Sequence, residues 1–121
     1  MKPRRPMPPN DALRERFGAN LRDSRKRLNI SQWELAFRAE TGITSVGPIE
    51  LGQKIPRIDT FIRLAGALKV SPNELAAGIL WTPAEIEITP GSFDVPEDPE
   101  FAAEVAALRK AAPGRGKRAK R

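Results

Sequence analysis

The side chains that most often carry out catalysis are missing from this chain. Its 121 residues include neither Cys nor His. These absences exclude thiol nucleophiles, Ser-His-Asp triads, histidine acid–base chemistry and zinc fingers. Asp and Glu are plentiful, at 15 residues, but they show no metal-ligand spacing, and no Gly-rich phosphate loop accompanies them. We therefore predict no catalytic residues, no cofactor and no metal site.

The chemistry that remains is that of cations, with 21 Lys and Arg and a formal net charge of +6. Residues 1–82 carry 14 bases and eight acids. Residues 83–104 carry seven acids and no base, whereas residues 105–121 carry seven bases and no acid. A basic body with a basic tail favours a polyanionic partner, and nucleic acid is the first candidate. The alternative is that a net charge of this size only keeps the protein soluble.

The elements that must position these cations are organised around residues 31–57. Ser31 is a natural helix N-cap, and Glu34 completes a capping box. The helical pattern breaks at residues 40–42, and a second apolar pattern in three-residue steps ends at Gly52. Its members are Ile43, Val46 and Ile49. Two short helices with a Gly-containing corner indicate a helix-turn-helix, although helical proteins that bind no nucleic acid contain the same corner.

Three more helices are predicted around this pair. The first runs from a cap at Asn10 or Asp11 to a stop at Asn29. The second covers residues 57–69, and the third covers residues 72–77, where a Ser-Pro-x-Glu start signal opens the helix. Five short helices with short loops predict a compact all-α bundle that ends near residue 81.

The C-terminal part of the chain has a different character. Polar and apolar side chains alternate in residues 85–89. The apolar residues Phe93 and Val95 also lie two positions apart, so both stretches are predicted to be short extended segments. These segments are expected to form a two-stranded ribbon on the bundle or to pair across a dimer. A helix is expected from Pro99 to about Ala112, either docked on the bundle or reserved for a partner.

The chain therefore divides into five parts by composition. They are a disordered basic arm, a helix-turn-helix domain, an acidic linker with short strands, a C-terminal helix and a disordered basic tail. Their bounds are residues 1–9, 10–82, 83–97, 98–112 and 113–121.

Between Phe17 and Trp81 the chain contains a series of short motifs at fixed spacing, with no insertion or deletion between them. They are FGANLRDSRK, Ile30-Ser31-Gln32, Glu34-Leu35-Ala36, Ile49-Glu50 with Gly52, Pro56, Leu64-Ala65, Ala67-Leu68, Val70-Ser71-Pro72 and Glu74-Leu75. In this register, which covers about half the chain, the sequence resembles the Cro/phage-repressor type of helix-turn-helix domain, the Xre family of bacterial and phage regulators. The segment PRIDTFIRLAGALKVSPNELAAGILW looks especially like regulators of actinobacterial type. The resemblance implies a five-helix, lambda-repressor-like DNA-binding bundle with a C-terminal extension.

The resemblance also implies which residues meet double-stranded DNA. Gln32 matches the residue that holds a phosphate at the start of the second helix. Residues 42–48 match the face that enters the major groove, and Gln53 and Lys54 match contacts to the backbone. The predicted DNA contacts are Arg22, Arg25, Lys26, Gln32, Ile43, Thr44, Ser45, Gln53 and Lys54.

This segment departs from the family at the residues that read bases. It has no Arg, Lys, Asn or Gln before Gln53, so only single hydroxyl bonds and a thymine-methyl contact remain for direct readout. Pro48 in the middle of a helix would cost about 3 kcal/mol. We therefore predict a shortened or kinked third helix near Val46, with Thr44 or Ser45 as its cap and Pro48 in or near its first turn.

Trp33 lies on the exposed side of the second helix, where the family usually has a polar residue. It is expected to be a half-buried packing residue, a phosphate contact through its indole N–H, or part of a protein interface. Phe37, one turn later, shares its face and favours the interface.

The leading functional prediction is a cytoplasmic, nucleoid-associated transcriptional regulator. It is expected to repress transcription as a homodimer on a palindromic operator, with half-sites about one helical turn apart. The alternative is a helix-turn-helix used mainly for protein–protein interaction, with weak or non-specific DNA binding and a partner bound through residues 83–112. An enzyme is disfavoured by the missing side chains, and no apolar run is long enough to cross a membrane.

Overall fold

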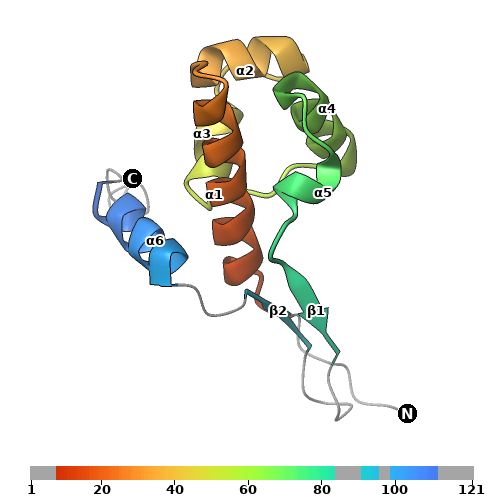
Figure 1. Cartoon of the computed structure of the whole chain (residues 1–121). Coiled ribbons are helices and arrows are strands. Elements are labelled where there is room, and N and C mark those ends of the chain that lie inside the picture. The colour runs from red at the N-terminus through yellow and green to blue at the C-terminus, as the bar shows by residue number, and fades with distance from the viewer. Residues whose placement is uncertain (1–7, 84–90, 96–98, 112–121) are drawn as a thin grey trace, which may run out of the picture.

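The computed structural model of the chain describes residues 8–83, 91–95 and 99–111. Within these residues, Figure 1 shows a bundle of five helices, a two-stranded ribbon below it and a sixth helix against the outer side of the first. The bundle helices are α1 (Asp11–Arg27), α2 (Gln32–Ala39), α3 (Val46–Glu50), α4 (Ile58–Leu68) and α5 (Pro72–Leu75). The extension consists of β1 (Leu80–Thr82), β2 (Ser92–Asp94) and α6 (Pro99–Ala111). The predicted all-α bundle with a C-terminal extension is confirmed.

One apolar face of each bundle helix contributes to a single core. Phe17 and Leu21 face inward from α1, and an edge-to-face contact joins the Phe17 ring to Phe61 of α4, with the ring centroids 5.4 Å apart. The other core residues are Leu35, Ala36, Ala39, Val46, Ile49, Leu64, Ala65, Leu68 and Leu75. No buried side-chain nitrogen or oxygen lacks a hydrogen-bond partner in the described part of the chain. A small core of this kind fixes the helices that carry the surface residues.

The helix ends follow the local signals in the sequence. Asn29, Glu40 and Lys69 adopt left-handed backbone conformations just after α1, α2 and α4, which lets the chain leave each helix. The Ser31 hydroxyl accepts a hydrogen bond from the Glu34 N–H at 3.0 Å, so the predicted N-cap is present. The Glu34 carboxylate, however, accepts a hydrogen bond from Arg38 at 2.9 Å. The hydrogen bond to the serine side chain of the capping box is therefore present, and the Glu34 side chain is bound to Arg38.

The third helix is short, as Pro48 predicts. It comprises only Val46–Glu50, which puts Pro48 at the third helical position. The first turn of a helix leaves its N–H groups without partners inside the helix, so a proline there removes no bond. A separate turn precedes the helix, with the Ser45 N–H donating to the Gly42 carbonyl at 3.0 Å. Ile43 lies in this turn and is exposed, so it is not the first core residue of the apolar pattern.

The first and third helices approach each other very closely. A Cβ atom added to Gly18 of α1 would lie 2.4 Å from the carbonyl oxygen of Ile49. Arg14, one turn earlier, donates from Nε to the Gly52 carbonyl at 3.1 Å. Glycine at position 18 therefore lets α3 lie directly on α1, and Arg14 fixes the turn that follows α3.

The ribbon pairs β1 and β2 antiparallel within one chain, with Leu80 opposite Asp94 and Thr82 opposite Ser92. Trp81 and Phe93 form its apolar side, with ring centroids 5.1 Å apart and an interplanar angle of 61°. The strand predicted at residues 85–89 lies outside the described residues. The strand that pairs with β2 is instead Leu80–Thr82, which the sequence predicts as the end of the bundle.

Candidate nucleic-acid interface

The first turn of α2 presents Gln32 at the surface. Ser31 caps the helix in an extended conformation, and Gln32, the first helical residue, is exposed. The unpaired N–H groups of a helix start attract anions, and the helix dipole adds to this attraction. An exposed carboxamide beside such a helix start is suited to hold a phosphate of the DNA backbone.

A buried carboxylate fixes the position of Gln32. Its Nε2 donates to Oε1 of Glu50 at 3.0 Å, so α2 is linked to the last residue of α3. Arg25 of α1 donates to the two oxygens of the same carboxylate at 2.6 and 2.9 Å. The Glu50 side chain is only 3% exposed and that of Arg25 only 13%. Three helices therefore meet at one hydrogen-bonded network, and its outermost member is Gln32.

Arg25, one of the predicted DNA contacts, forms hydrogen bonds within the fold. Besides Glu50, its guanidinium donates from Nη1 to the Ile30 carbonyl at 2.9 Å. The hydrogen bonds to Glu50 raise the pKa of Arg25 above its usual value, against the opposing effect of burial. Arg25 therefore binds the same carboxylate that accepts a hydrogen bond from Gln32.

The segment predicted to enter the major groove lies on the surface. Ile43 and Thr44 are exposed, while Ser45 is partly covered as the residue before α3. Gly47 follows in the first turn of α3, where an added Cβ atom would lie 3.5 Å from Oε1 of Gln32. The start of α3 is therefore next to Gln32. The segment predicted to enter the groove therefore lies next to the residue predicted to contact a phosphate.

The remaining predicted contacts lie at the margins of this surface. Lys54 is exposed in the turn after α3, and Gln53 beside it is partly buried. Arg22 is partly buried on α1, four residues after Gly18, which places it on the side of α1 that faces α3. Lys26 lines an open depression with Asp23 and Arg27 at the end of α1. An acid therefore shares the surroundings of Lys26.

The residues that position this surface could not all be recognised in the sequence. Glu50 is a buried acid that follows the apolar residue Ile49, and only the fold shows that it joins Arg25 to Gln32. Gly18 and Arg14 hold α3 and the turn after it against α1. A glycine inside a predicted helix was the one signal available, because such a residue usually marks a close approach.

Trp33 and Phe37 form an exposed aromatic pair on α2. Their rings are stacked, with centroids 5.4 Å apart and an interplanar angle of 5°. Trp33 is 51% exposed and Phe37 67% exposed. Trp33 therefore packs on Phe37 rather than on the core.

Among the residues that the structure describes, no group of three or more Asp and Glu side chains is arranged to hold a metal ion. No helix among the described residues is long and apolar enough to cross a membrane.

Comparison with known proteins identifies the arrangement of α1–α5. A helix-turn-helix family model matches residues 21–75. Among solved structures, the restriction-modification controller protein C.AhdI from Aeromonas hydrophila is 35% identical over 55% of this chain and 96% of its own, with a TM-score of 0.53. The hypothetical transcription factor NHTF from Neisseria is 26% identical over 63% of this chain and 86% of its own, with a TM-score of 0.52.

A third structure resembles the chain over a longer range. The clp gene regulator ClgR from Corynebacterium glutamicum is 22% identical over 88% of this chain and all of its own, with a TM-score of 0.54. At this identity the likeness concerns the fold alone. No curated protein sequence matches the chain at a significant level.

Proposed function

Because the chain belongs to the Xre type of helix-turn-helix family, whose members are DNA-binding transcriptional regulators, we propose that it represses transcription as a homodimer on a palindromic operator. One observation carries the proposal. Gln32, at the capped start of α2, is tied through Glu50 to α3, so the phosphate contact and the groove face are held as one unit.

In the proposed complex, the turn before α3 and the start of α3 enter the major groove. Gln32 and the first N–H groups of α2 bind a phosphate on one side of the groove. Lys54, with Gln53, binds the backbone on the other side. Arg22 and Lys26 add positive charge, while Arg25 positions Gln32 through the carboxylate of Glu50.

Affinity in this complex comes mainly from the phosphate backbone. The exposed groove residues Ile43 and Thr44 offer an apolar contact and one hydroxyl, whereas strong direct readout requires bidentate side chains. Sequence preference then rests in part on the shape and deformability of the operator. Binding by such a protein weakens steeply as the salt concentration rises.

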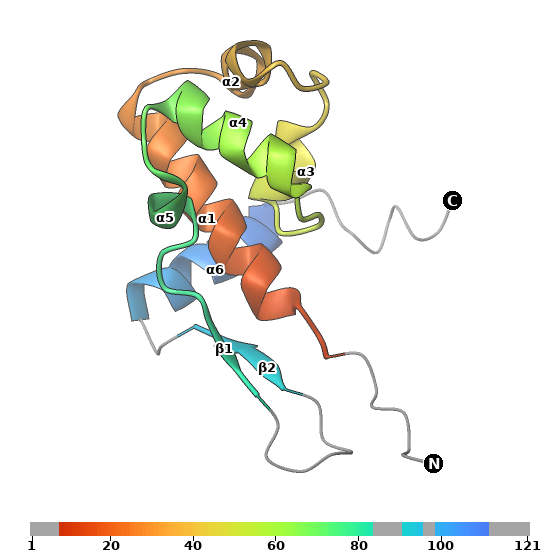
Figure 2. The ribbon, with the colours of Figure 1, turned by 90° about the vertical axis from the view of Figure 1, so that its right-hand side faces the viewer.

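The homodimer requires an apolar surface beside α3, so that both recognition surfaces face the same side of the DNA. Ile58 and Ile62 fit this requirement. They lie one turn apart on α4 and are 72% and 49% exposed. Figure 2 shows that α4 begins next to α3. A symmetric contact through these two residues brings the two α3 helices to one face of the dimer.

Charge reversal at Lys54 tests the proposal, with Lys69→Glu as the matched control. Lys69 is an exposed lysine at the end of α4 remote from α3. We expect Lys54→Glu to lower the affinity for the DNA upstream of the protein's own gene by at least about tenfold. The dependence of affinity on salt concentration should also fall, by about the amount that one phosphate contact contributes. Lys69→Glu should bind like the parent protein. Equal affinity of the parent for the upstream region and for random DNA would contradict a sequence-specific repressor.

A second candidate function rests on the stacked pair Trp33 and Phe37. Aromatic residues are enriched in protein interfaces, and this pair lies beside the DNA surface rather than in the core. In this alternative the helix-turn-helix mainly binds another protein. Trp33→Gln together with Phe37→Gln separates the two functions, because an unchanged affinity for the operator and a lost regulatory effect would favour the protein partner.

A further inference from the structure

The outer side of α2 carries two adjacent stripes of side chains. Trp33 and Phe37, one turn apart, form the stacked aromatic pair. Glu34 and Arg38 form the second stripe, and an ion pair of 2.9 Å joins Arg38 Nε to Glu34 Oε2, with both side chains 38% exposed. Because a helix turns by about 100° per residue, the two stripes lie side by side. One helix face therefore presents an apolar stripe bordered by one acid and one base.

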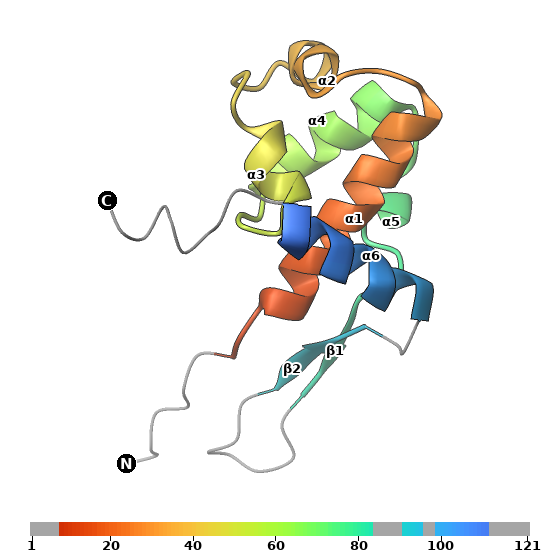
Figure 3. The same cartoon turned by 90° about the vertical axis from the view of Figure 1, so that its left-hand side faces the viewer.

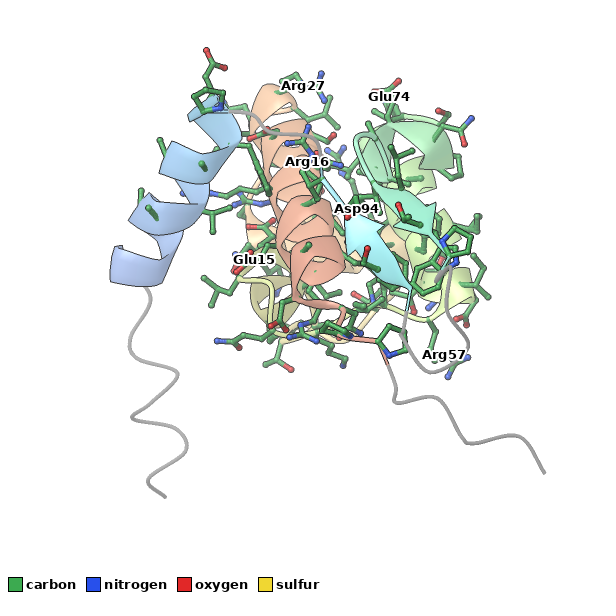
Figure 4. The ribbon with its side chains drawn as sticks, turned by 90° about the horizontal axis from the view of Figure 1, so that it is seen from below. Glu15, Arg16, Arg27, Arg57, Glu74 and Asp94 are labelled. Carbon is green, nitrogen blue, oxygen red and sulfur yellow. The ribbon has the colours of Figure 1, made fainter. Side chains whose placement is uncertain are left out.

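None of the described elements lies over this face. In Figures 1, 2 and 3, α2 lies across one end of the bundle, and the ribbon lies at the opposite end. Figure 4 looks at that opposite end, where α6 and the ribbon lie beside α1. The ring of Phe101 in α6 meets the guanidinium of Arg16 there, 4.5 Å from the guanidinium carbon to the ring centroid. The described extension is therefore attached to α1 and leaves α2 exposed.

The same face points away from the dimer contact proposed on α4. The helix α4 meets α2 through Arg63, whose Nε donates to the Ala39 carbonyl at the end of α2, at 2.9 Å. Arg63 lies about 100° around the helix from Ile62, on the side away from Ile58. The exposed isoleucines and α2 are therefore on different sides of α4. A dimer formed through α4 leaves the outer face of each α2 accessible.

The order of the charges makes this face complementary to an inverted copy of itself. Across a two-fold axis between antiparallel α2 helices, Trp33 of each copy meets Phe37 of the other. The charged stripes then lie on one edge, so Glu34 of each copy is opposite Arg38 of the other. A parallel pair would instead place Glu34 opposite Glu34 and Arg38 opposite Arg38, which repel. Charge therefore selects the antiparallel arrangement.

The size of the apolar stripe sets the strength of such a contact. Trp33 is 51% exposed and Phe37 67% exposed, and rings of this kind bury 150–250 Å², so the stripe offers roughly 250 Å² per copy. Two copies then bury about 500 Å² of apolar surface, well below the 1,200–2,000 Å² of stable interfaces. The contact is too small to hold free molecules together. It is sufficient between molecules bound side by side on one DNA, where their local concentration is high.

We propose that the outer face of α2 binds a second copy of this chain, antiparallel across a two-fold axis, and joins neighbouring dimers on DNA. This inference rests on the proposed DNA binding as a homodimer, and it names a second copy as the partner of the stacked aromatic pair. Operators that lie side by side are then filled cooperatively.

Charge reversal on α2 tests the contact on DNA. The affinity for one operator is compared with that for two operators, separated by spacers that cover one helical turn in single base-pair steps. At one phase of the spacing, we expect the parent to bind the second site about fivefold or more tightly. Glu34→Arg and Arg38→Glu should each lose this gain, because like charges then face each other. The double variant Glu34→Arg, Arg38→Glu restores opposite charges and should recover it.

Two controls isolate the contact between copies. The gain is taken relative to the affinity of each variant for the single operator, so any direct effect of the charges on DNA binding cancels. Glu74→Arg is the matched control, because Glu74 is also an acid in the first turn of a helix, α5, and is exposed (Figure 4). It should keep the gain. Circular dichroism checks that each variant is folded.

A pair of cysteine variants tests the same geometry without DNA. The chain contains no Cys, so Glu34→Cys and Arg38→Cys each introduce a single thiol. A disulfide requires Cα atoms within about 7 Å, and the antiparallel contact brings position 34 of one copy to position 38 of the other. After mild oxidation of an equimolar mixture, mass spectrometry should find the mixed product above the share that random pairing gives.

The outcomes separate this inference from the proposed function. No gain in the parent, a gain that survives the single reversals, or no recovery in the double variant overturns the inference, as does random cysteine pairing. If no gain is found but Trp33→Gln with Phe37→Gln abolishes regulation, the face binds a different protein and the inference is wrong. In each case Lys54→Glu and the single operator still report on DNA binding. Loss of operator preference in the parent removes the proposed function, while the cysteine pair still reports on α2.

Discussion

Glu50 is an acid at a buried position of α3, where its neighbours Val46 and Ile49 are apolar. Its carboxylate receives hydrogen bonds from Arg25 and from Gln32. A buried ion pair of this kind contributes little net stability compared with apolar residues, but removal of one partner is costly because the other charge remains. The network is therefore better explained as a means of orienting the Gln32 side chain than as a source of folding stability. It determines where the Gln32 carboxamide lies.

Substitution at this network separates stability from DNA binding. We expect Glu50→Ala to lower the free energy of unfolding by about 3 kcal/mol, because Arg25 is left without its partner. The double variant Arg25→Met, Glu50→Leu should recover most of that stability and still bind DNA more weakly than the parent, since nothing then holds Gln32. Urea unfolding and fluorescence anisotropy measure the two quantities. Parent-like affinity in the double variant would show that Gln32 needs no support.

At the scale of elements, the contact between α1 and α3 determines the position of α3 and so of the proposed recognition surface. Gly18 permits the contact, because its Cα atom faces the backbone of Ile49 and Glu50. Arg14 then holds the turn at Gly52. A short helix of five residues has few contacts of its own, so its position depends on this packing.

Two glycine substitutions test the contact. Gly18→Ala should destabilise the protein by about 1–3 kcal/mol, because a Cβ atom 2.4 Å from a backbone oxygen forces α3 outward. Gly66→Ala is the matched control in α4, where nothing lies within 4 Å of an added Cβ atom. It should stabilise the protein by up to about 1 kcal/mol through helix propensity. Thermal unfolding of both variants checks the signs, and equal effects would contradict a close α1–α3 contact.

Local signals in the sequence predicted most element boundaries, and tertiary relations account for the differences. Ser31 and Gly52 act through their own backbone neighbours, so their roles could be predicted. Pro48 likewise predicted a short α3, which is confirmed. The exposure of Ile43 could not be predicted from the apolar spacing, because it depends on where α3 begins. The role of Arg25 depends on a carboxylate 25 residues away in sequence, which no local pattern reveals.

At the scale of the whole molecule, the exposed apolar residues are distributed over separate surfaces. Ile58 and Ile62 lie on α4, Trp33 and Phe37 on α2, and Leu80 and Trp81 on the ribbon. Figure 2 shows that α4 begins next to α3, so the dimer proposed through this pair would present two proposed recognition surfaces together. The described ribbon is already paired within one chain, so it does not need a second copy.

Charged substitutions on α4 test this dimer surface. We expect Ile58→Glu together with Ile62→Glu to yield a monomer that remains folded, because both side chains are exposed. The monomer should bind a single half-site with similar affinity and lose the tighter binding to a two-half-site operator. Analytical ultracentrifugation and binding to the two DNA lengths provide the measurements. A dimer that survives both substitutions would assign the interface to another surface.

The placement of the two tryptophans has an optical consequence. The chain has no Tyr, and its two Trp residues are Trp33 and Trp81. One stacks on Phe37 beside Gln32, and the other packs against Phe93 and Gly91 in the ribbon. Each half of the molecule therefore contains one intrinsic fluorophore. With Trp81→Phe the emission reports on α2 alone, and with Trp33→Phe it reports on the ribbon alone, so events at the DNA surface and in the extension can be followed separately without a label.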